Sequence, residues 1–270
     1  MLSTVFEEVG GRKVRVARSG HGPALVLLHG YPDNLQIWSE LAPRLAESFD
    51  VIAFDWPGMG YSEEWPGGAT PGHLADRLAV LLDHWNIQQT AVIGMDMGSQ
   101  PALVFAAKHP ERINRLVVMN GLAFHDEHTS WEIEVLRNFG WNRWILRHLP
   151  GPVFRRALRT FLPRGMDLPA ELKKDLWNSF RRNEVRRFIS KMCAGYQGAL
   201  AQLPSFYARI QAPTLIVWAQ NDKHFPPAHA ERLHAAIPGS TLRIIAGAEH
   251  WMVLHKAEET ARVILDFARH

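Results

Sequence analysis

The sequence predicts an α/β fold in which helices flank a mostly parallel central sheet, and three observations support that prediction. Short runs of β-branched and apolar residues alternate with longer segments of helical periodicity. The runs at 24–29 and 51–54 are almost wholly apolar, as expected of strands buried on both faces. A further run at 90–93 passes through a glycine-bracketed turn into a helix. This order of strands and helices predicts parallel strands joined by right-handed crossovers.

The first part of the chain supplies strands and helices in turn. Residues 14–17 alternate in polarity like an edge strand. Helices are predicted at 37–46, at 73–85 and from the glycine-bracketed turn to about residue 107. A further strand follows at 116–119.

The alternation stops between residues 121 and 205. This segment is helical in pattern, rich in Arg and Trp, and interrupted by Pro150, Pro152, Pro163 and Pro169. Strands resume at 214–218 and 242–245, and a helix from about residue 258 closes the chain. A helical block between sheet strands predicts a lid over the strand ends. We therefore expect a core of residues 1–120 and 206–270 and a helical cap (lid) of residues 121–205.

Composition excludes several classes of function. The 270 residues are 47% hydrophobic and 21% charged, as in ordinary globular proteins, and no apolar run approaches the length of a membrane span. The net charge of +3 is too small to indicate nucleic-acid binding. Residues 121–210 nevertheless contain 15 Lys and Arg against 8 Asp and Glu, a net charge of +7. That segment either steers anionic substrates or consists of ordinary solvated helices.

Cysteine usage and the N-terminal residues predict a cytoplasmic location. Cys193 is the single cysteine, and residues 1–5 have no basic and apolar leader. No cluster of His, Cys and acidic residues has metal-ligand spacing, and no phosphate-binding glycine loop precedes a helix, so we expect neither a metal nor a cofactor. Whether the protein is a monomer or a homodimer stays open.

The stretch 94–98 reads Gly-Met-Asp-Met-Gly and fits the pattern Gly-x-nucleophile-x-Gly. In that pattern small flanking residues permit a strained turn, which lifts one side chain above the end of the sheet. The lifted residue is Asp96, which we interpret as a nucleophile. Two alternatives are an Asp96 without a catalytic function and Ser99 as the nucleophile, although the position of Ser99 is more typical of support for the helix start.

Two further residues complete a candidate catalytic triad. Asp222 follows the strand at 214–218, and His250 lies in a Gly-x-x-His loop after the strand at 242–245, so both belong at the carboxyl edge of the sheet beside Asp96. We expect Asp222 to orient the imidazole of His250, which acts as the base. The alternative for Asp222 is a turn-capping carboxylate. A rival position for the acid holds Asn120, whose amide cannot supply a charge.

The chain order of nucleophile, acid and base, the turn at Asp96 and the loop His29-Gly30-Tyr31-Pro32 resemble the α/β-hydrolase family over the whole chain. The resemblance implies an oxyanion hole formed by the backbone N–H groups of Tyr31 and Met97. An Asp nucleophile is similar to the branch that contains epoxide hydrolases and haloalkane and haloacetate dehalogenases. In that branch the carboxylate attacks an sp³ carbon, an alkyl-enzyme ester forms, and the histidine activates the water that hydrolyses it.

Residues that stabilise the leaving group separate the members of this branch. Haloalkane dehalogenases typically have a Trp directly after the nucleophile and often an Asn in the His-Gly loop, and haloacetate dehalogenases have Arg after the nucleophile and again three residues later. This sequence has Met97, Tyr31 and Gln100 at these positions. Epoxide hydrolases have an aromatic residue before the Pro of the His-Gly loop, as Tyr31 is, and protonate the epoxide oxygen with lid tyrosines. Tyr196 lies close to the position of one of them.

The second lid tyrosine of that family is missing, since no Tyr occurs between residues 121 and 195. We expect Tyr207 to serve in packing. Other candidate proton donors are Trp131, Trp141, Trp144 and His148, but we expect each of them in the core of the lid.

The favoured interpretation is a cofactor-independent hydrolase that opens an epoxide of a small-molecule substrate to a diol through the Asp96 ester. Hydrolytic dehalogenation of a haloalkane or haloacid is the first alternative. A non-catalytic ligand-binding homologue is the second.

Overall fold

The computed structural model describes residues 1–138 and 140–269 and contains an eight-stranded sheet. The strand order is β1-β2-β4-β3-β5-β6-β7-β8. β2 pairs antiparallel with both β1 and β4, and every other neighbouring pair is parallel, which confirms the predicted mostly parallel sheet. The strands are β1 Val5–Val9, β2 Arg12–Ser19, β3 Ala24–Leu28, β4 Asp50–Phe54, β5 Thr90–Met95, β6 Ile113–Met119, β7 Thr214–Ala219 and β8 Thr241–Ile245.

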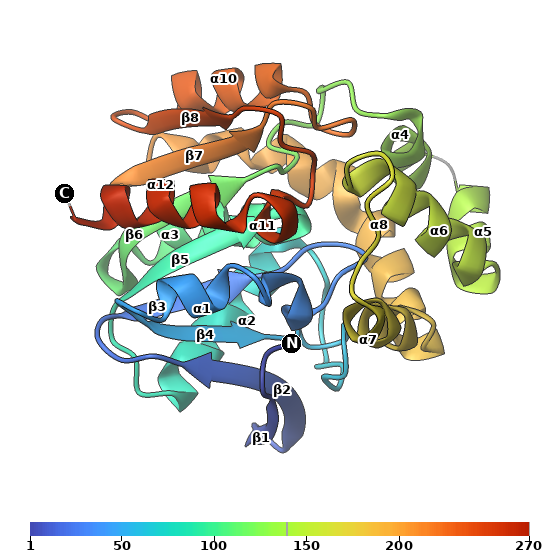
Figure 1. The fold of residues 1–270 in the computed structure, drawn as a ribbon, viewed down its shortest axis with the longest axis horizontal. Coiled ribbons are helices and arrows are strands. Elements are labelled where there is room, and N and C mark those ends of the chain that lie inside the picture. The colour runs from blue at the N-terminus through green and yellow to red at the C-terminus, as the bar shows by residue number, and fades with distance from the viewer. Residues whose placement is uncertain (139, 270) are drawn as a thin grey trace.

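Helices cover both faces of the sheet (Figure 1). In this view α1 and α12 lie in front of the sheet, and α2 and α3 lie behind it. The helices and 3-10 turns of this part of the chain are η1 Leu35–Trp38, α1 Ala42–Leu45, α2 Pro71–His84, η2 Asp96–Gly98, α3 Ser99–Lys108, η3 Pro110–Arg112, α10 Pro227–Ala236, α11 Met252–His255 and α12 Ala257–Arg269.

Two expectations near the N-terminus are wrong. Residues 14–17 lie in β2, which has a neighbour on each side because β1 occupies the edge. The helix expected at 37–46 is broken into η1 and α1. Pro43 stands in the first turn of α1, where its missing N–H costs nothing, and it cannot continue the hydrogen bonding of a preceding turn.

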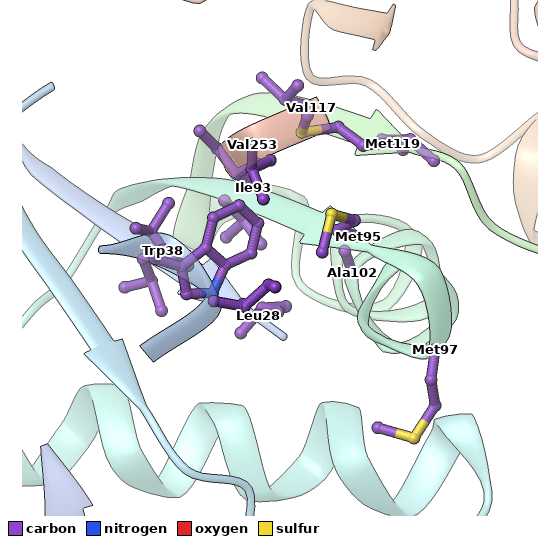
Figure 2. Packing of buried hydrophobic residues seen from close by; sticks show 14 of the residues in the cluster. Leu28, Trp38, Ile93, Met95, Met97, Ala102, Val117, Met119 and Val253 are labelled. Atoms are coloured by element: carbon purple, nitrogen blue, oxygen red, sulfur yellow. The ribbon is translucent and has the colours of Figure 1, made fainter. Parts of the chain in front are cut away.

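A packed layer of apolar side chains fixes the strand ends from which the candidate site emerges. Figure 2 shows Trp38 of η1 and Val253 of α11 close to Leu28 of β3 and Ile93 of β5, and all four side chains are fully buried. Met97 points away from this cluster (Figure 2). The chain turns directly after β5, at Asp96, and stays buried through Met97 and α3.

The segment between β6 and β7 folds into helices, as predicted for a lid. They are α4 Trp131–Asn138, α5 Gly140–His148, α6 Pro150–Phe161, α7 Ala170–Phe180, α8 Asn183–Gln202 and α9 Pro204–Tyr207. Helices α4 to α8 gather at one end of the molecule, on the right of Figure 1, and α12 ends on the left. The division of the chain into a core of residues 1–120 and 206–270 and a cap of residues 121–205 stays a prediction.

Asp175 of α7 ties the lid to the sheet. Its carboxylate accepts two hydrogen bonds from the guanidinium of Arg15 in β2, at 3.2 and 3.0 Å, and one from the side chain of Asn34, at 2.7 Å. Arg15 is buried, so this contact is shielded from water. None of the described helices combines the length and the apolar character needed to cross a membrane.

Candidate active site

The turn between β5 and α3 presents Asp96 as predicted. Asp96 has a φ of +52°, in the left-handed region that most side chains avoid. Two glycines allow the surrounding chain to approach it closely: a Cβ on Gly98 would lie 2.2 Å from the carbonyl oxygen of Leu28, and one on Gly30 would lie 2.4 Å from the Asp96 side chain. The Ser99 hydroxyl donates to the Asp96 carbonyl oxygen at 2.6 Å, in the supporting position that we expected.

The two carboxylate oxygens of Asp96 have different surroundings. Oδ1 accepts a hydrogen bond from the backbone N–H of Tyr31 at 2.7 Å, whereas Oδ2 lies 3.5 Å from Nε2 of His250. The residue is 6% exposed, so both contacts are shielded from solvent. The Tyr31 N–H thus holds one oxygen and leaves the other facing the imidazole. A contribution from the N–H of Met97 to this oxyanion hole stays a prediction.

His29 anchors the loop that carries the Tyr31 N–H. Its Nδ1 lies 2.9 Å from the carbonyl oxygen of Gly30, and its Nε2 accepts the backbone N–H of Trp56 at 3.1 Å. Burial lowers the pKa of His29 to about 4. A neutral ring with one donor and one acceptor nitrogen satisfies both contacts, so His29 has a structural role.

His250 and Asp222 form a buried pair. Nδ1 of His250 lies 2.7 Å from Oδ2 of Asp222, and both side chains are shielded from solvent. The other oxygen of Asp222 accepts the backbone N–H groups of His224, at 2.8 Å, and Phe225, at 3.0 Å. Asp222 therefore caps the turn with one oxygen and orients the imidazole with the other, so both of its proposed roles are filled.

The charge state of His250 depends on its two carboxylate neighbours. Burial alone would lower the pKa of His250, but the charge and hydrogen bond of Asp222, together with Asp96, outweigh it and raise that pKa to about 10. The two carboxylates together therefore favour the protonated form of the imidazole at neutral pH.

A small chamber lies above Asp96. It has a volume of about 50 Å³ and is lined mostly by apolar side chains. Tyr31, Tyr196 and the charged Arg137 also line it. A second cavity of about 270 Å³ lies next to it in the lid, and Tyr31, Ile133 and Leu136 line both. The larger cavity is bounded by α4, α5 and α6 and is almost entirely apolar. The site suits a largely hydrophobic substrate whose reactive end reaches Asp96.

A family model described as the alpha/beta hydrolase fold matches residues 23–257. The chain belongs to the α/β-hydrolase family. A hydrolase from Pseudomonas putida, 2-hydroxy-6-oxononadienedioate/2-hydroxy-6-oxononatrienedioate hydrolase 2, is 31% identical over 261 residues, which cover 91% of this chain and 87% of that protein.

Solved α/β structures resemble this one over nearly its whole length. An esterase from Thermogutta terrifontis has a TM-score of 0.82 at 22% identity, and an epoxide hydrolase, CorEH, has a TM-score of 0.83 at 18% identity. Each comparison covers 99% of this chain and 98% of the other. At these identities the likeness concerns the fold alone.

Two phenols of this hydrolase reach the catalytic chamber. The hydroxyl of Tyr196, in α8, donates to Oε1 of Gln100 at 2.7 Å. The hydroxyl of Tyr31 is buried and has no hydrogen-bond partner among the described residues. Burial raises the pKa of both phenols well above the ordinary value, so both keep their protons at neutral pH. Sequence reasoning noted that Tyr31 is aromatic and assigned its backbone N–H a role, but it did not consider the phenol as a proton donor.

The expectation that the lid tryptophans form a core is wrong. Trp131, Trp141 and Trp144 are 64%, 60% and 58% exposed, and His148 is exposed as well. The lid is too thin at α4 and α5 to cover large side chains on its outer face. Tyr207, in contrast, is buried and its hydroxyl donates to the carbonyl oxygen of Ala123, which confirms its packing role.

Sequence reasoning also missed two positions beside the triad. Asn120, which has a φ of +42°, donates its amide to the carbonyl oxygen of His250 at 2.8 Å and accepts the N–H of Ala219 at 2.9 Å. It links β6, β7 and the histidine loop. Arg137 of α4 is 5% exposed and lines the chamber, and its guanidinium donates to the carbonyl oxygens of His125 and Glu127. Nothing in the periodicity of α4 distinguished this arginine from its solvated neighbours.

Proposed function

We propose that this α/β-hydrolase uses the carboxylate of Asp96 as a nucleophile toward an sp³ carbon, and that the reaction is the hydrolysis of an epoxide to a diol. The observation that carries the proposal is that the two carboxylate oxygens of Asp96 have different contacts. Oδ1 is fixed by the Tyr31 N–H at 2.7 Å, and Oδ2 lies 3.5 Å from Nε2 of the imidazole. A carboxylate held in this way needs no base to attack an alkyl carbon.

In the first step Oδ2 of Asp96 forms a bond to an oxirane carbon, and the carbon–oxygen bond of the ring breaks. Its electron pair passes to the ring oxygen, which must receive a proton. Tyr31 is the better donor of the two phenols, because Tyr196 already donates its proton to Gln100. The products of the step are an alkyl ester on Asp96 and a phenolate.

Formation of the ester removes the negative charge of Asp96. That charge is one of the causes that raise the pKa of His250, so the pKa falls once the ester has formed. The imidazolium then returns a proton to the phenolate and becomes a neutral base. The same group is therefore protonated while Asp96 attacks and free to accept a proton afterwards.

In the second step Nε2 of His250 takes a proton from water, and the water oxygen attacks the carbonyl carbon of the ester. The negative charge that develops falls on the oxygen held by the Tyr31 N–H, which is the role of an oxyanion hole. When this intermediate collapses, the bond between the ester carbon and the alcohol oxygen breaks and that oxygen takes the second proton of the water, which gives the diol and the carboxylate; His250 keeps the first proton, as in the starting state. Asp222 stabilises the imidazolium throughout the step.

The names of the relatives offer a different substrate class. The Pseudomonas putida relative is named as a hydrolase of 2-hydroxy-6-oxononadienedioate and 2-hydroxy-6-oxononatrienedioate. A carboxylate that attacked a carbonyl group of such a ketone would form a reactive anhydride, whereas its attack on an alkyl carbon gives an ordinary ester. The residue at position 96 therefore supports alkyl substrates over carbonyl substrates.

The experiment is intact-mass spectrometry of the His250→Gln variant after incubation with separate panels of epoxides, haloalkanes and haloacids. Without its base the ester should form and persist. We expect an adduct with the full mass of an epoxide, and none in a His250→Gln, Asp96→Ala double variant. An adduct with the mass of a halide substrate minus hydrogen halide would assign dehalogenation instead. A folded variant that gains no mass with any panel would overturn the ester mechanism and leave a ligand-binding role.

A further inference from the structure

The outer surface of the lid exposes large apolar side chains. Ten such side chains are exposed among the described residues, and five of them lie between residues 131 and 166. They are Trp131, Trp141, Trp144, Leu149 and Met166. Trp131 and Trp141 are the most exposed of all ten and stand at the rim of the large apolar cavity. Exposed aromatic side chains gathered at the mouth of a cavity indicate a contact surface.

The same segment of the lid is strongly basic. Residues 140–165 contain six arginines and neither Asp nor Glu. Arg156 pairs with Glu132 across α4 and α6. Arg147, Arg155, Arg159 and Arg164 are exposed, and within the described part of the chain no acidic side chain pairs with them. The positive charge of the surface is therefore largely uncompensated.

The apolar and the basic parts adjoin along α6. One side of this helix contributes Val153, Arg156 and Ala157 to the apolar cavity. The other side contributes Arg155 and Arg159 to a hollow of about 500 Å³, which also contains Arg164, Lys173, Lys223 and Asp167; Lys173 pairs with Asp167, and Lys223 pairs with Glu249. Figure 1 shows α5 at the outer edge of the lid, on the side away from the sheet. We call Trp131, Trp141, Trp144, Leu149, Arg147, Arg155, Arg159 and Arg164 the lid surface.

We propose that the lid surface docks on an anionic lipid membrane, with the tryptophans in the interfacial layer and the arginines on the headgroup phosphates. Tryptophan is enriched at membrane interfaces because its ring is apolar and its N–H is polar. Arginines beside it add attraction to anionic headgroups. The basic hollow beside α6 accommodates phosphate groups, and the apolar cavity opens beside the tryptophans that enter the lipid.

Charge favours a lipid surface over a second copy of the chain. A two-fold contact would place the lid surface against itself and bring the unpaired arginines of both copies together. A nucleic acid would supply phosphates that pair with the arginines, but it would leave the exposed side chains of Trp141, Trp144 and Leu149 without an apolar partner. A bilayer surface supplies both anionic groups and hydrocarbon. Apolar substrates that dissolve in the membrane would then reach the cavity without crossing water.

The test is co-sedimentation of the full chain with phosphatidylcholine vesicles and with vesicles that also contain phosphatidylglycerol. We expect binding to the mixed vesicles alone, and a loss of binding as salt is added. Brominated acyl chains should quench the tryptophan emission of the bound protein. A Trp141→Ser, Trp144→Ser variant should lose most of that quenching, and an Arg155→Glu, Arg159→Glu variant should bind more than ~10-fold more weakly.

The matched control is Arg262→Glu, Arg269→Glu, which reverses two exposed charges on α12 at the opposite end of the molecule (Figure 1). It should bind as the unaltered protein does, and the melting temperature of each variant checks its folding. Equal loss of binding in the control, or no binding to mixed vesicles, would overturn the proposal. So would a change from dimer to monomer in the lid variants or preferential binding to duplex DNA. No substrate is present, so the result does not depend on the Asp96 chemistry.

Discussion

The protonation of His250 depends on the charge of Asp96, because a negative charge beside the imidazole helps it to keep its second proton. They lie 3.5 Å apart, and the pKa of His250 is raised to about 10 although burial opposes the charge. Oδ2 of Asp222 lies 2.7 Å from Nδ1 of His250 and fixes the orientation of the ring. The titration of His250 is therefore the direct measure of this coupling.

Asp96→Asn should lower the pKa of His250, because it removes one of the two negative charges that raise it. The imidazole of the variant should lose its proton at a lower pH than that of the unaltered protein. The measurement is an NMR pH titration of nitrogen-labelled histidine. Asp83→Asn, at an exposed site on α2, is the control and should leave the titration unchanged. An unchanged pKa in Asp96→Asn would contradict the coupling.

Asn120→Asp should destabilise the protein by about 1–3 kcal/mol and reduce turnover. The new carboxylate can still accept the N–H of Ala219, but it cannot donate to the carbonyl oxygen of His250. Urea unfolding and single-turnover kinetics measure the two effects. Asn86→Asp is the control, since Asn86 also has a positive φ but is exposed. A variant as stable as the control would show that the amide does not hold the histidine loop.

The sequence predicted the positions of those residues whose placement depends on nearby strands and motifs. It did not predict roles that depend on contacts with distant parts of the chain. Asp96 follows β5 directly, and Asp222 and His250 lie in the loops after β7 and β8, so the order of strands was enough to bring them together. Asn120 also follows a strand, but its role depends on two partners that are 99 and 130 residues away. The tyrosine N–H was predicted from the loop motif, whereas the buried position of the phenol of Tyr31 depends on lid packing.

At the scale of elements, the contact between the β5–α3 turn and the end of β3 determines where the nucleophile stands. Gly98 packs against the carbonyl group of Leu28 so closely that a side chain has no room. The apolar strands themselves were predictable from composition. The break between η1 and α1 and the extra edge strand β1 could not be predicted. Periodicity shows which face of an element is apolar, but it does not show which element packs beside it.

Gly98→Ala should cost about 3 kcal/mol or more, or prevent folding, because its Cβ would lie 2.2 Å from a backbone oxygen. Gly198→Ala is the opposite case. Gly198 lies within α8, and a Cβ there would have nothing within 4 Å, so the substitution should stabilise the protein by about 0.5–1 kcal/mol. Thermal unfolding of both variants checks the pair. Similar stability of the two would contradict the close contact.

At the scale of the molecule, the sheet fixes the triad and the lid shapes the space above it. The pattern of residues 121–205 correctly predicted helices but not which faces they cover, since a helix with apolar residues on two sides can bury only one of them in a thin layer. The exposure of the lid tryptophans therefore became visible only in three dimensions. The contact between Asp175 and Arg15 links the two parts across 160 residues.

Asp175→Ala should loosen the lid and destabilise the protein by about 1.5–3 kcal/mol, because it removes charged acceptors from Arg15 and Asn34. Hydrogen exchange should quicken first in α7. Asp266→Ala removes a carboxylate from an exposed pair with Arg269 and should change stability by less than about 1 kcal/mol. Equal effects of the two substitutions would show that the Asp175 contact does not secure the lid.

The unequal oxygens of Asp96 also have a stereochemical consequence. In the proposed mechanism Oδ1 is held by the Tyr31 N–H, so Oδ2 attacks the substrate, and it does so from the side opposite the departing oxygen. That approach inverts the configuration of the attacked carbon once. The water of the second step attacks the ester carbonyl and not that carbon, so nothing reverses the inversion. A racemic epoxide would therefore yield products whose handedness records which carbon Asp96 reached.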